Sequence, residues 1–122
     1  MIKLNYFPNN AEPRNKINQK FNTYFDEKKK THTFMDFYES AFLCGMLKQK
    51  QPKKILEVGV AGGGTTSIIL QALEDLGKPY EMHSTDISET FYVNKSKLTG
   101  FVATIAKENN LLITPPPVYL VR

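Results

Sequence analysis

Residues 54–66 have the sequence KILEVGVAGGGTT, an apolar run that ends in a cluster of glycines. A short apolar run of this kind is typical of a strand buried in a parallel sheet. The glycines predict a tight turn in which the backbone can approach a ligand, because they carry no Cβ. A helix that begins after such a turn presents free N–H groups to the same space. The segment therefore predicts a strand, a glycine loop and a helix, with a ligand at the loop.

The helix after the loop has clear signals at both ends. Thr65 and Thr66 are residues that favour the N-terminal cap, and Gly77 supplies the C-terminal stop, with a proline two residues beyond it. The spacing of the apolar residues predicts one inner face, made of Ile68, Ile69, Ala72, Leu73 and Leu76.

Strand and helix continue to alternate along the rest of the chain. We expect strands at residues 80–86 and 118–121, separated by a helix at residues 96–109. The order βαβαβ predicts an α/β fold with a parallel sheet and right-handed crossovers. In such sheets, ligands bind at the carboxyl ends of the strands, which is where the glycine loop lies.

Two helices are expected before the first strand. The spacing of apolar residues predicts one at residues 14–29, with Ile17 on its inner face. A second begins at Phe34, is capped by Thr33 and stops before Pro52, because a residue that precedes proline avoids helical geometry. The pattern predicts that this second helix buries a stripe of Phe34, Phe37, Tyr38, Ala41, Phe42 and Gly45.

The composition bounds the class of protein. The chain has 122 residues, of which 41% are hydrophobic and 23% charged, as in a single globular domain. No apolar run approaches the roughly 20 residues that span a bilayer, and the N-terminus does not resemble a signal peptide. The single cysteine, Cys44, cannot form an internal disulfide, which favours a cytoplasmic protein. One cysteine and two histidines also cannot build a structural zinc site.

The charge is unevenly distributed. The chain carries a net charge of +4, yet residues 1–54 have 11 basic against 5 acidic residues and the remainder has 5 against 7. The excess comes largely from lysines at 28–30 and 48–54, which stand beside Gln and Pro rather than among stacking aromatic residues. We therefore expect a solvated basic surface rather than a nucleic-acid interface.

Two carboxylates narrow the chemistry of the ligand. Glu57 lies at the carboxyl end of the first strand, where its charge opposes a phosphate but suits a ligand with an ammonium group. Asp86 ends the next strand, 27 residues beyond Gly59, where a carboxylate can accept both hydroxyls of a ribose.

With these residues, the sequence resembles the class I S-adenosylmethionine-dependent methyltransferases. Their first motif is an acid followed by a glycine-rich loop, and a second acid ends the next strand. The segments YESAFL (38–43), LEVGVAGGGTT (56–66) and STDIS (84–88) resemble a bacterial subgroup related to sugar O-methyltransferases and cephalosporin-hydroxylase-like proteins. The resemblance extends over about residues 35–101. The residues that it implies for S-adenosylmethionine binding are Glu57, Gly59, Ala61, Gly63, Gly64, Thr65 and Asp86.

The resemblance also implies an architecture and a reaction. The fold would be the N-terminal half of a Rossmann-like three-layer sandwich, with a helical segment at residues 1–52 and a partial cofactor-binding domain at residues 53–122. The reaction would be O-methyl transfer to a sugar or another small-molecule hydroxyl. In full-length relatives, a base or a divalent metal activates the acceptor after the fourth strand, so no catalytic or metal-ligating residue is assigned in this chain.

Other interpretations of the same residues fit less well. A dinucleotide-binding fingerprint needs a glycine where Ala61 stands, and a P-loop needs a lysine after Gly64. A structural turn without a ligand is the third alternative. His83 and His32 are expected to be a strand residue and a loop residue without a catalytic role, and Cys44 a buried, unreactive thiol.

The sequence after Gly100 and Phe101 departs from the pattern of these methyltransferases. We therefore expect an N-terminal fragment of such an enzyme, with an open sheet edge and exposed apolar faces that favour self-association into homo-oligomers. Two hypotheses follow. The chain is a methyltransferase by ancestry that holds half of the cofactor site, or it is a remnant or small binding module that keeps the cofactor loop without turnover.

Overall fold

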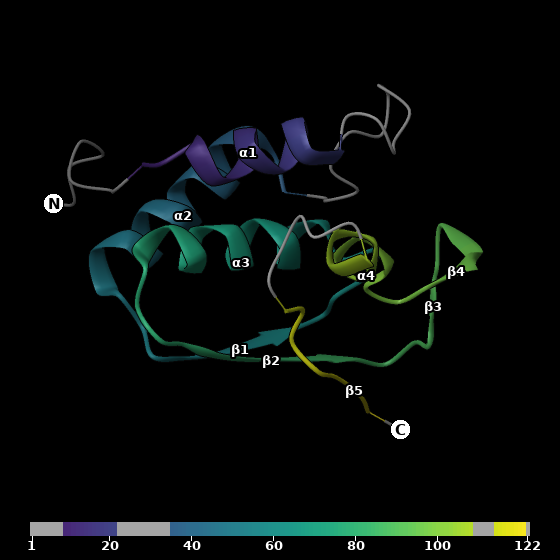
Figure 1. Cartoon of the computed structure of the whole chain (residues 1–122). Coiled ribbons are helices and arrows are strands. Elements are labelled where there is room, and N and C mark those ends of the chain that lie inside the picture. Colours follow the sequence, from purple (N-terminus) through teal and green to yellow (C-terminus); the bar gives the residue numbers. More distant parts are fainter. Residues whose placement is uncertain (1–8, 22–34, 109–113, 122) are drawn as a thin grey trace, which may run out of the picture.

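The structure is a computed structural model, and it describes residues 9–21, 35–108 and 114–121. Two helices precede the first strand, and a short antiparallel hairpin separates the second strand from the last helix (Figure 1). In chain order the elements are α1 (Glu12–Phe21), α2 (Phe37–Lys50), β1 (Lys54–Val58), α3 (Gly64–Leu76), β2 (Glu81–Asp86), β3 (Thr90–Phe91), β4 (Asn94–Leu98), α4 (Phe101–Glu108) and β5 (Val118–Leu120).

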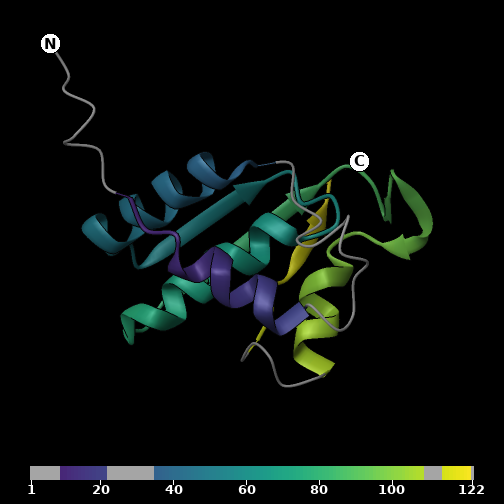
Figure 2. The same ribbon diagram turned by 90° about the horizontal axis from the view of Figure 1, so that it is seen from above.

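The main sheet is parallel and has the strand order β1-β2-β5. Its register pairs Leu56 with His83 and Thr85 with Tyr119. The helices lie together on one face of this sheet (Figure 1). Seen from above, α1 crosses over α3 (Figure 2). The prediction of an α/β fold with parallel strands in the order βαβαβ is confirmed.

The hydrophobic core lies around α3. This helix buries every residue from Thr66 to Leu73, because the sheet lies beneath it and the other helices pack around it. Four of its five predicted inner-face residues are buried, and Leu76 is half-buried. Residues from other elements complete the core, namely Ile17, Cys44, Leu47, Met82, Phe91, Phe101 and Val102.

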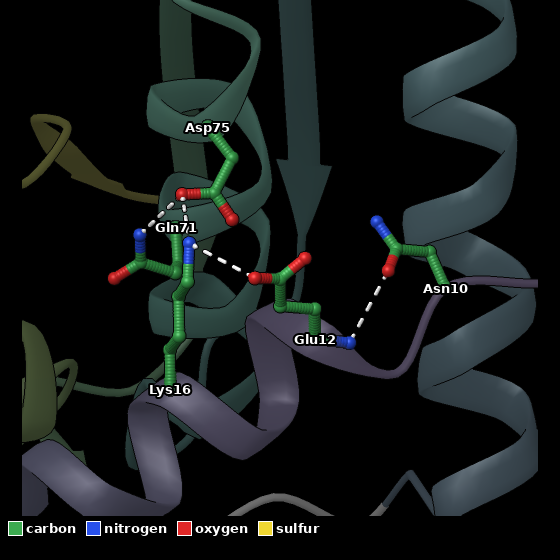
Figure 3. Close-up of polar contacts among 5 residues, drawn as sticks. All are labelled: Asn10, Glu12, Lys16, Gln71 and Asp75. Atoms are coloured by element: carbon green, nitrogen blue, oxygen red, sulfur yellow. Dashed lines mark hydrogen bonds and ion pairs between the residues drawn. The ribbon is translucent and has the colours of Figure 1, made fainter.

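A polar cluster holds α1 on α3 (Figure 3). The Lys16 ammonium lies 2.9 Å from Oδ1 of Asp75 and 3.6 Å from Oε1 of Glu12, and Gln71 donates to the same Asp75 oxygen. The backbone N–H of Glu12 donates to Asn10 at the start of the helix. The hydrogen bond to Asp75 is the main reason that the pKa of Lys16 lies above its ordinary value.

The predicted division of the chain into a helical segment at residues 1–52 and a cofactor-binding domain at residues 53–122 remains a prediction.

The prediction that the second helix starts at Phe34 is wrong. Helix α2 begins at Phe37, and its N-cap is Asp36, whose side chain accepts a 2.7 Å hydrogen bond from the backbone N–H of Glu39. The proposed cap, Thr33, lies outside the described residues, as does the predicted helical segment at residues 22–29.

The predicted buried stripe of α2 is also largely wrong. Phe37, Tyr38 and Phe42 are exposed, Tyr38 to 77%. The helix instead packs through smaller residues, because the segment that leads into α1 approaches its backbone closely: the N–H of Asn10 donates to the carbonyl of Ala41 at 2.8 Å. The residues that it buries are Ser40, Ala41, Cys44, Gly45 and Leu47.

The prediction of one helix over residues 96–109 is wrong in its first part. Residues 94–98 form β4, which pairs with β3, and Leu98 is 68% exposed rather than on a helical inner face. The helix begins at Phe101 because Gly100, with a φ of 75°, separates it from the hairpin. The predicted strand at residues 118–121 is confirmed as β5, one residue shorter.

One face of the sheet is not covered by the described helices. Leu56 is 66% and Val58 79% exposed, and Tyr119 of β5 lies on the same open face, across β2 from Val58. β1 is therefore buried on only one side, which corrects the prediction of a fully buried strand. Parallel sheets normally have both faces covered, so we expect this exposed apolar surface to bind another protein surface.

We expect the chain to self-associate through this open face. The double substitution Leu56→Lys and Val58→Lys adds charge there and should shift the assembly toward the 13.9 kDa monomer. Light scattering coupled to size-exclusion chromatography measures the change. The control is Ile87→Lys, at an equally exposed apolar residue outside the sheet. An assembly that the double substitution leaves unchanged would show that the face is not the interface.

Within the described residues, no helix is long and apolar enough to cross a membrane.

Candidate functional site

The glycine loop joins the end of β1 to the start of α3 and has an unusual backbone. Gly59, Ala61 and Gly63 all have positive φ angles, of 87°, 52° and 92°. Alanine seldom adopts this left-handed region, since its Cβ approaches the carbonyl oxygen there. Surrounding contacts must therefore hold Ala61 in this conformation.

Those contacts come from β2 and from the start of α4. The N–H of Gly59 donates to the carbonyl of Thr85 at 2.8 Å, which continues the β1–β2 pairing into the loop. On the other side, the chain that leads into α4 closes over the loop. The N–H groups of Gly100 and Val102 donate to the carbonyls of Ala61 and Gly62 at 2.9 and 3.0 Å. Backbone hydrogen bonds thus hold the loop on both sides.

The glycines of the loop serve two different purposes. A Cβ on Gly63 would lie 3.0 Å from the Cα of Gly100, so this glycine is needed for the close approach of two backbones. A Cβ on Gly59 would meet no atom within 4 Å. The space beside Gly59, at the carboxyl end of β1, is therefore available to a ligand.

Asp86 fastens the loop to the end of β2. One of its carboxylate oxygens accepts hydrogen bonds from the N–H groups of Val60 and Ala61, at 2.8 and 3.0 Å, and the other from that of Ser88 at 2.9 Å. Burial alone would raise the pKa of this carboxyl. The N–H groups of Ser88, Ala61, Val60 and Ile87 together outweigh that effect, and the pKa lies below its ordinary value.

Glu57 is directed into the interior between the sheet and α3. Its Oε1 accepts hydrogen bonds from the hydroxyls of Thr66, at 2.6 Å, and Ser84, at 2.8 Å. The residue is only 9% exposed, and this burial raises its pKa despite the two hydroxyl donors. Glu57 thus joins β1, α3 and β2 through one oxygen.

The structure divides the predicted site residues into two groups. Gly59, Ala61 and Asp86 meet on the loop, whereas Glu57 and Gly63 are engaged by the protein itself. The remaining two residues lie in the first turn of α3, where Gly64 is buried and Thr65 half-buried.

Sequence reasoning missed the partners of the two carboxylates. Thr66 does not cap α3, which has Gly63 at its N-cap, but donates to Glu57. Ser84 stands two residues before Asp86, and this period of two places both on the same face of β2. That spacing was the available signal for Ser84.

Three residues were expected to lack a catalytic role, and the structure describes the contacts of two of them, His83 and Cys44. His83 lies on the open face, with Nε2 2.6 Å from a Glu81 oxygen and Nδ1 3.0 Å from the Tyr119 hydroxyl. Cys44 is buried, and burial, helped by the charge of Asp75, raises the pKa of its thiol to about 11. His32 lies outside the described residues. Within the described part of the chain, no three His, Cys, Asp or Glu residues gather in a way that could hold a metal ion.

Comparison with known proteins gives two similarities. No protein-family model matches the chain. It is 41% identical over 59 residues to the non-reducing polyketide synthase sorB of Penicillium rubens, a match that covers 48% of this chain and 2% of the synthase. Among solved structures, the citrinin polyketide synthase CMeT domain matches with a TM-score of 0.41 and 27% identity, over 68% of this chain and 20% of that one. The chain thus spans a small part of either protein.

Proposed function

We propose that the chain binds S-adenosylmethionine at the glycine loop and belongs, by ancestry, to the methyltransferases. The observation that carries the proposal is the open space at Gly59, which lies at the carboxyl end of β1 within reach of a carboxylate at the end of β2. The acid and glycine pattern of the sequence supports it.

The residues present fit the cofactor in one respect and require a rearrangement in another. The space beside Gly59 suits close approach of a ligand. Asp86, the proposed acceptor of the ribose hydroxyls, already accepts from four backbone N–H groups, about as many as a carboxylate has lone-pair sites. A ribose would therefore have to displace some of these N–H groups when the ligand binds.

Each residue of the site has a defined part in this proposal. S-adenosylmethionine supplies a methyl group on a sulfonium centre, which an acceptor attacks. Asp86 would orient the ribose, and the loop from Gly59 to Gly64 would hold the ligand against the end of β1. We propose that Glu57 positions the loop through Thr66 and Ser84 instead of binding the ligand's ammonium group.

The methyl acceptor has narrower support. The resemblance to sugar O-methyltransferases predicted a sugar hydroxyl, but the similar protein of Penicillium rubens is by its name a polyketide synthase. Our proposal is therefore limited to methyl transfer and does not extend to a sugar acceptor.

Calorimetric titration with S-adenosylhomocysteine tests the proposal, and NAD serves as the competing ligand. We expect binding in the micromolar range. Asp86→Asn should weaken it at least about tenfold, because a charged hydrogen-bond acceptor is lost. Binding of NAD without S-adenosylhomocysteine would favour the dinucleotide interpretation instead.

Two glycine substitutions distinguish the effect of filling the ligand's space from the conformational cost of an alanine at positive φ. Gly59 and Gly77 both have positive φ and open space around a new Cβ, but only Gly59 lies at the loop. Gly59→Ala should weaken binding by about tenfold or more, equivalent to about 1.4 kcal/mol, while Gly77→Ala leaves it unchanged. Equal weakening in both would mean that the ligand does not occupy the space at Gly59.

Turnover distinguishes an enzyme from a binding module. Methyl transfer by this chain alone, to a polyketide-type acceptor, would identify it as an enzyme. Binding of S-adenosylhomocysteine without transfer to any acceptor would favour the module that keeps only the cofactor loop.

A further inference from the structure

A hollow of about 800 Å³ lies at the amino end of the sheet, at the other end of β1 from the glycine loop. The ends of α2 and α3 and the starts of β1 and β2 surround it. None of the residues proposed for the cofactor site lines this hollow, so a ligand there would occupy a separate site.

The walls of the hollow are strongly basic. Lys50, Lys53, Lys54 and Lys78 line it, against a single lining carboxylate, Glu81. All four lysines are exposed at the surface, where their ammonium groups can reach a ligand. Four ammonium groups are therefore gathered around this one hollow.

Part of this charge is offset by neighbouring groups. The C-terminal ends of α2 and α3 each contribute about half a negative charge. The hydrogen bond with His83 and the charge of Lys54 lower the pKa of Glu81, so that carboxyl is ionised at neutral pH. Among the groups that line the hollow, four lysines, one carboxylate and two helix ends leave an excess of about two positive charges. Glu74, which contacts the lining through the Tyr80 hydroxyl, reduces this excess but leaves it positive.

None of the four lysines has an ion-pair partner among the residues that the structure describes. The ammonium group of Lys78 donates to the side-chain oxygen of Gln51, which ties the two walls together. No described carboxylate lies within ion-pair distance of Lys50 or Lys53. These two side chains are available for an anion.

The hollow also has an apolar part. Leu73 and Leu76 of α3 and Pro79 contribute to its lining. The ring of Tyr80 joins them, and its hydroxyl is turned to Glu74, to which it donates at 2.6 Å. A ligand that fills the hollow would therefore meet lysines at one side and apolar carbon at the other.

We propose that this hollow binds a small organic dianion, namely a phosphate monoester that carries an apolar group. A phosphate monoester has close to two negative charges at neutral pH, which the four lysines of the hollow can neutralise. Lysine binds phosphate as a point charge and needs no fixed geometry, which suits an open site. The apolar group would pack against Leu76 and Pro79, which are accessible from the hollow.

Titration with hexyl phosphate, followed by amide proton and nitrogen NMR, tests this proposal. We expect saturable shifts at the amides of Gln51, Lys53, Lys78 and Glu81, with the amides of the glycine loop unchanged. Inorganic phosphate and hexanol should each bind more weakly than hexyl phosphate, because each lacks half of the interaction. Inorganic phosphate that binds as tightly, or shifts that appear at the glycine loop, would overturn the proposal.

A pair of double variants controls for the net charge of the chain. Lys50→Gln with Lys53→Gln should weaken hexyl phosphate binding by about tenfold, the effect of losing two partly screened charge contacts. Lys95→Gln with Lys107→Gln removes the same charge from exposed positions outside the hollow and should leave binding unchanged. Equal weakening by the two double variants would mean that only the overall charge attracts the anion.

Discussion

Gly63→Ala is expected to destabilise the fold by about 2–5 kcal/mol, which combines about 1–2 kcal/mol for a left-handed alanine with about 1–3 kcal/mol for overpacking. The φ angle of Gly63 is 92°, and a new Cβ would meet the Cα, carbonyl carbon and carbonyl oxygen of Gly100 at 3.0–3.3 Å. These are backbone atoms, and the hydrogen bond from Gly100 to Ala61 holds them in place. The clash can be relieved only if the loop and the start of α4 separate.

Urea denaturation followed by circular dichroism measures this loss. The matched control is Gly77→Ala, since Gly77 also has a positive φ, of 65°, but no atom lies within 4 Å of a new Cβ. The control should lose only the conformational cost of about 1–2 kcal/mol. Equal losses for the two variants would contradict the close packing of the loop against Gly100.

Glu57→Ala is expected to cost about 3 kcal/mol, because it leaves two buried hydroxyls without their acceptor. The hydroxyls of Thr66 and Ser84 both donate to one oxygen of Glu57, and both residues are almost completely buried. Glu57→Gln keeps an acceptor oxygen at that position and should lose far less. Thermal unfolding compares the two variants, and equal destabilisation would show that the hydrogen bonds are not the cause.

The pH dependence of stability gives a second test of Glu57. Burial raises the pKa of this carboxyl in the folded chain above its ordinary value of 4.5, so the folded state binds the proton more tightly than the unfolded state. Its contribution to stability is therefore complete below about pH 4.5 and is lost as the pH rises through the folded-state pKa. In Glu57→Gln this decline should be absent. Unfolding free energies measured at several pH values test it, and an unchanged decline in the variant would assign it to another group.

Local signals in the chain were sufficient for the elements that carry the site. The apolar run before Gly59 predicted β1, and the spacing from Ile68 to Leu76 together with Gly77 predicted α3. The strands on either side of α3 in the chain, β1 and β2, lie close to their predicted positions. The position of Asp86 at the end of β2 followed from the same pattern. Each of these signals acts within a few residues, where periodicity and glycine geometry operate.

Sequence patterns gave wrong predictions in two situations. In one, a segment fitted both the helical and the strand period of apolar residues; in the other, the packing of neighbouring helices decided which face of a helix is buried. The stretch from Asn94 to Leu98 forms a strand because it pairs with β3, and its alternative as a helix lacks a buried face. In α2 the aromatic residues had the spacing of a core stripe, yet Tyr38 faces solvent and Ser40 is buried. The close approach of the segment that leads into α1, shown by the hydrogen bond from Asn10 to Ala41, favours small residues at that contact.

The amino-acid pattern was enough to establish the α/β class, the parallel order of the strands and the location of the loop between β1 and α3, because these depend on hydrophobic periodicity and on glycine. The partners of the two carboxylates depended on the tertiary structure. Asp86 meets the amides of Val60 and Ala61, and Glu57 meets Ser84, across separations of 25 to 27 residues. Hydrogen bonds over such distances along the chain form only after β1 and β2 have paired, so they could be identified only from the tertiary structure.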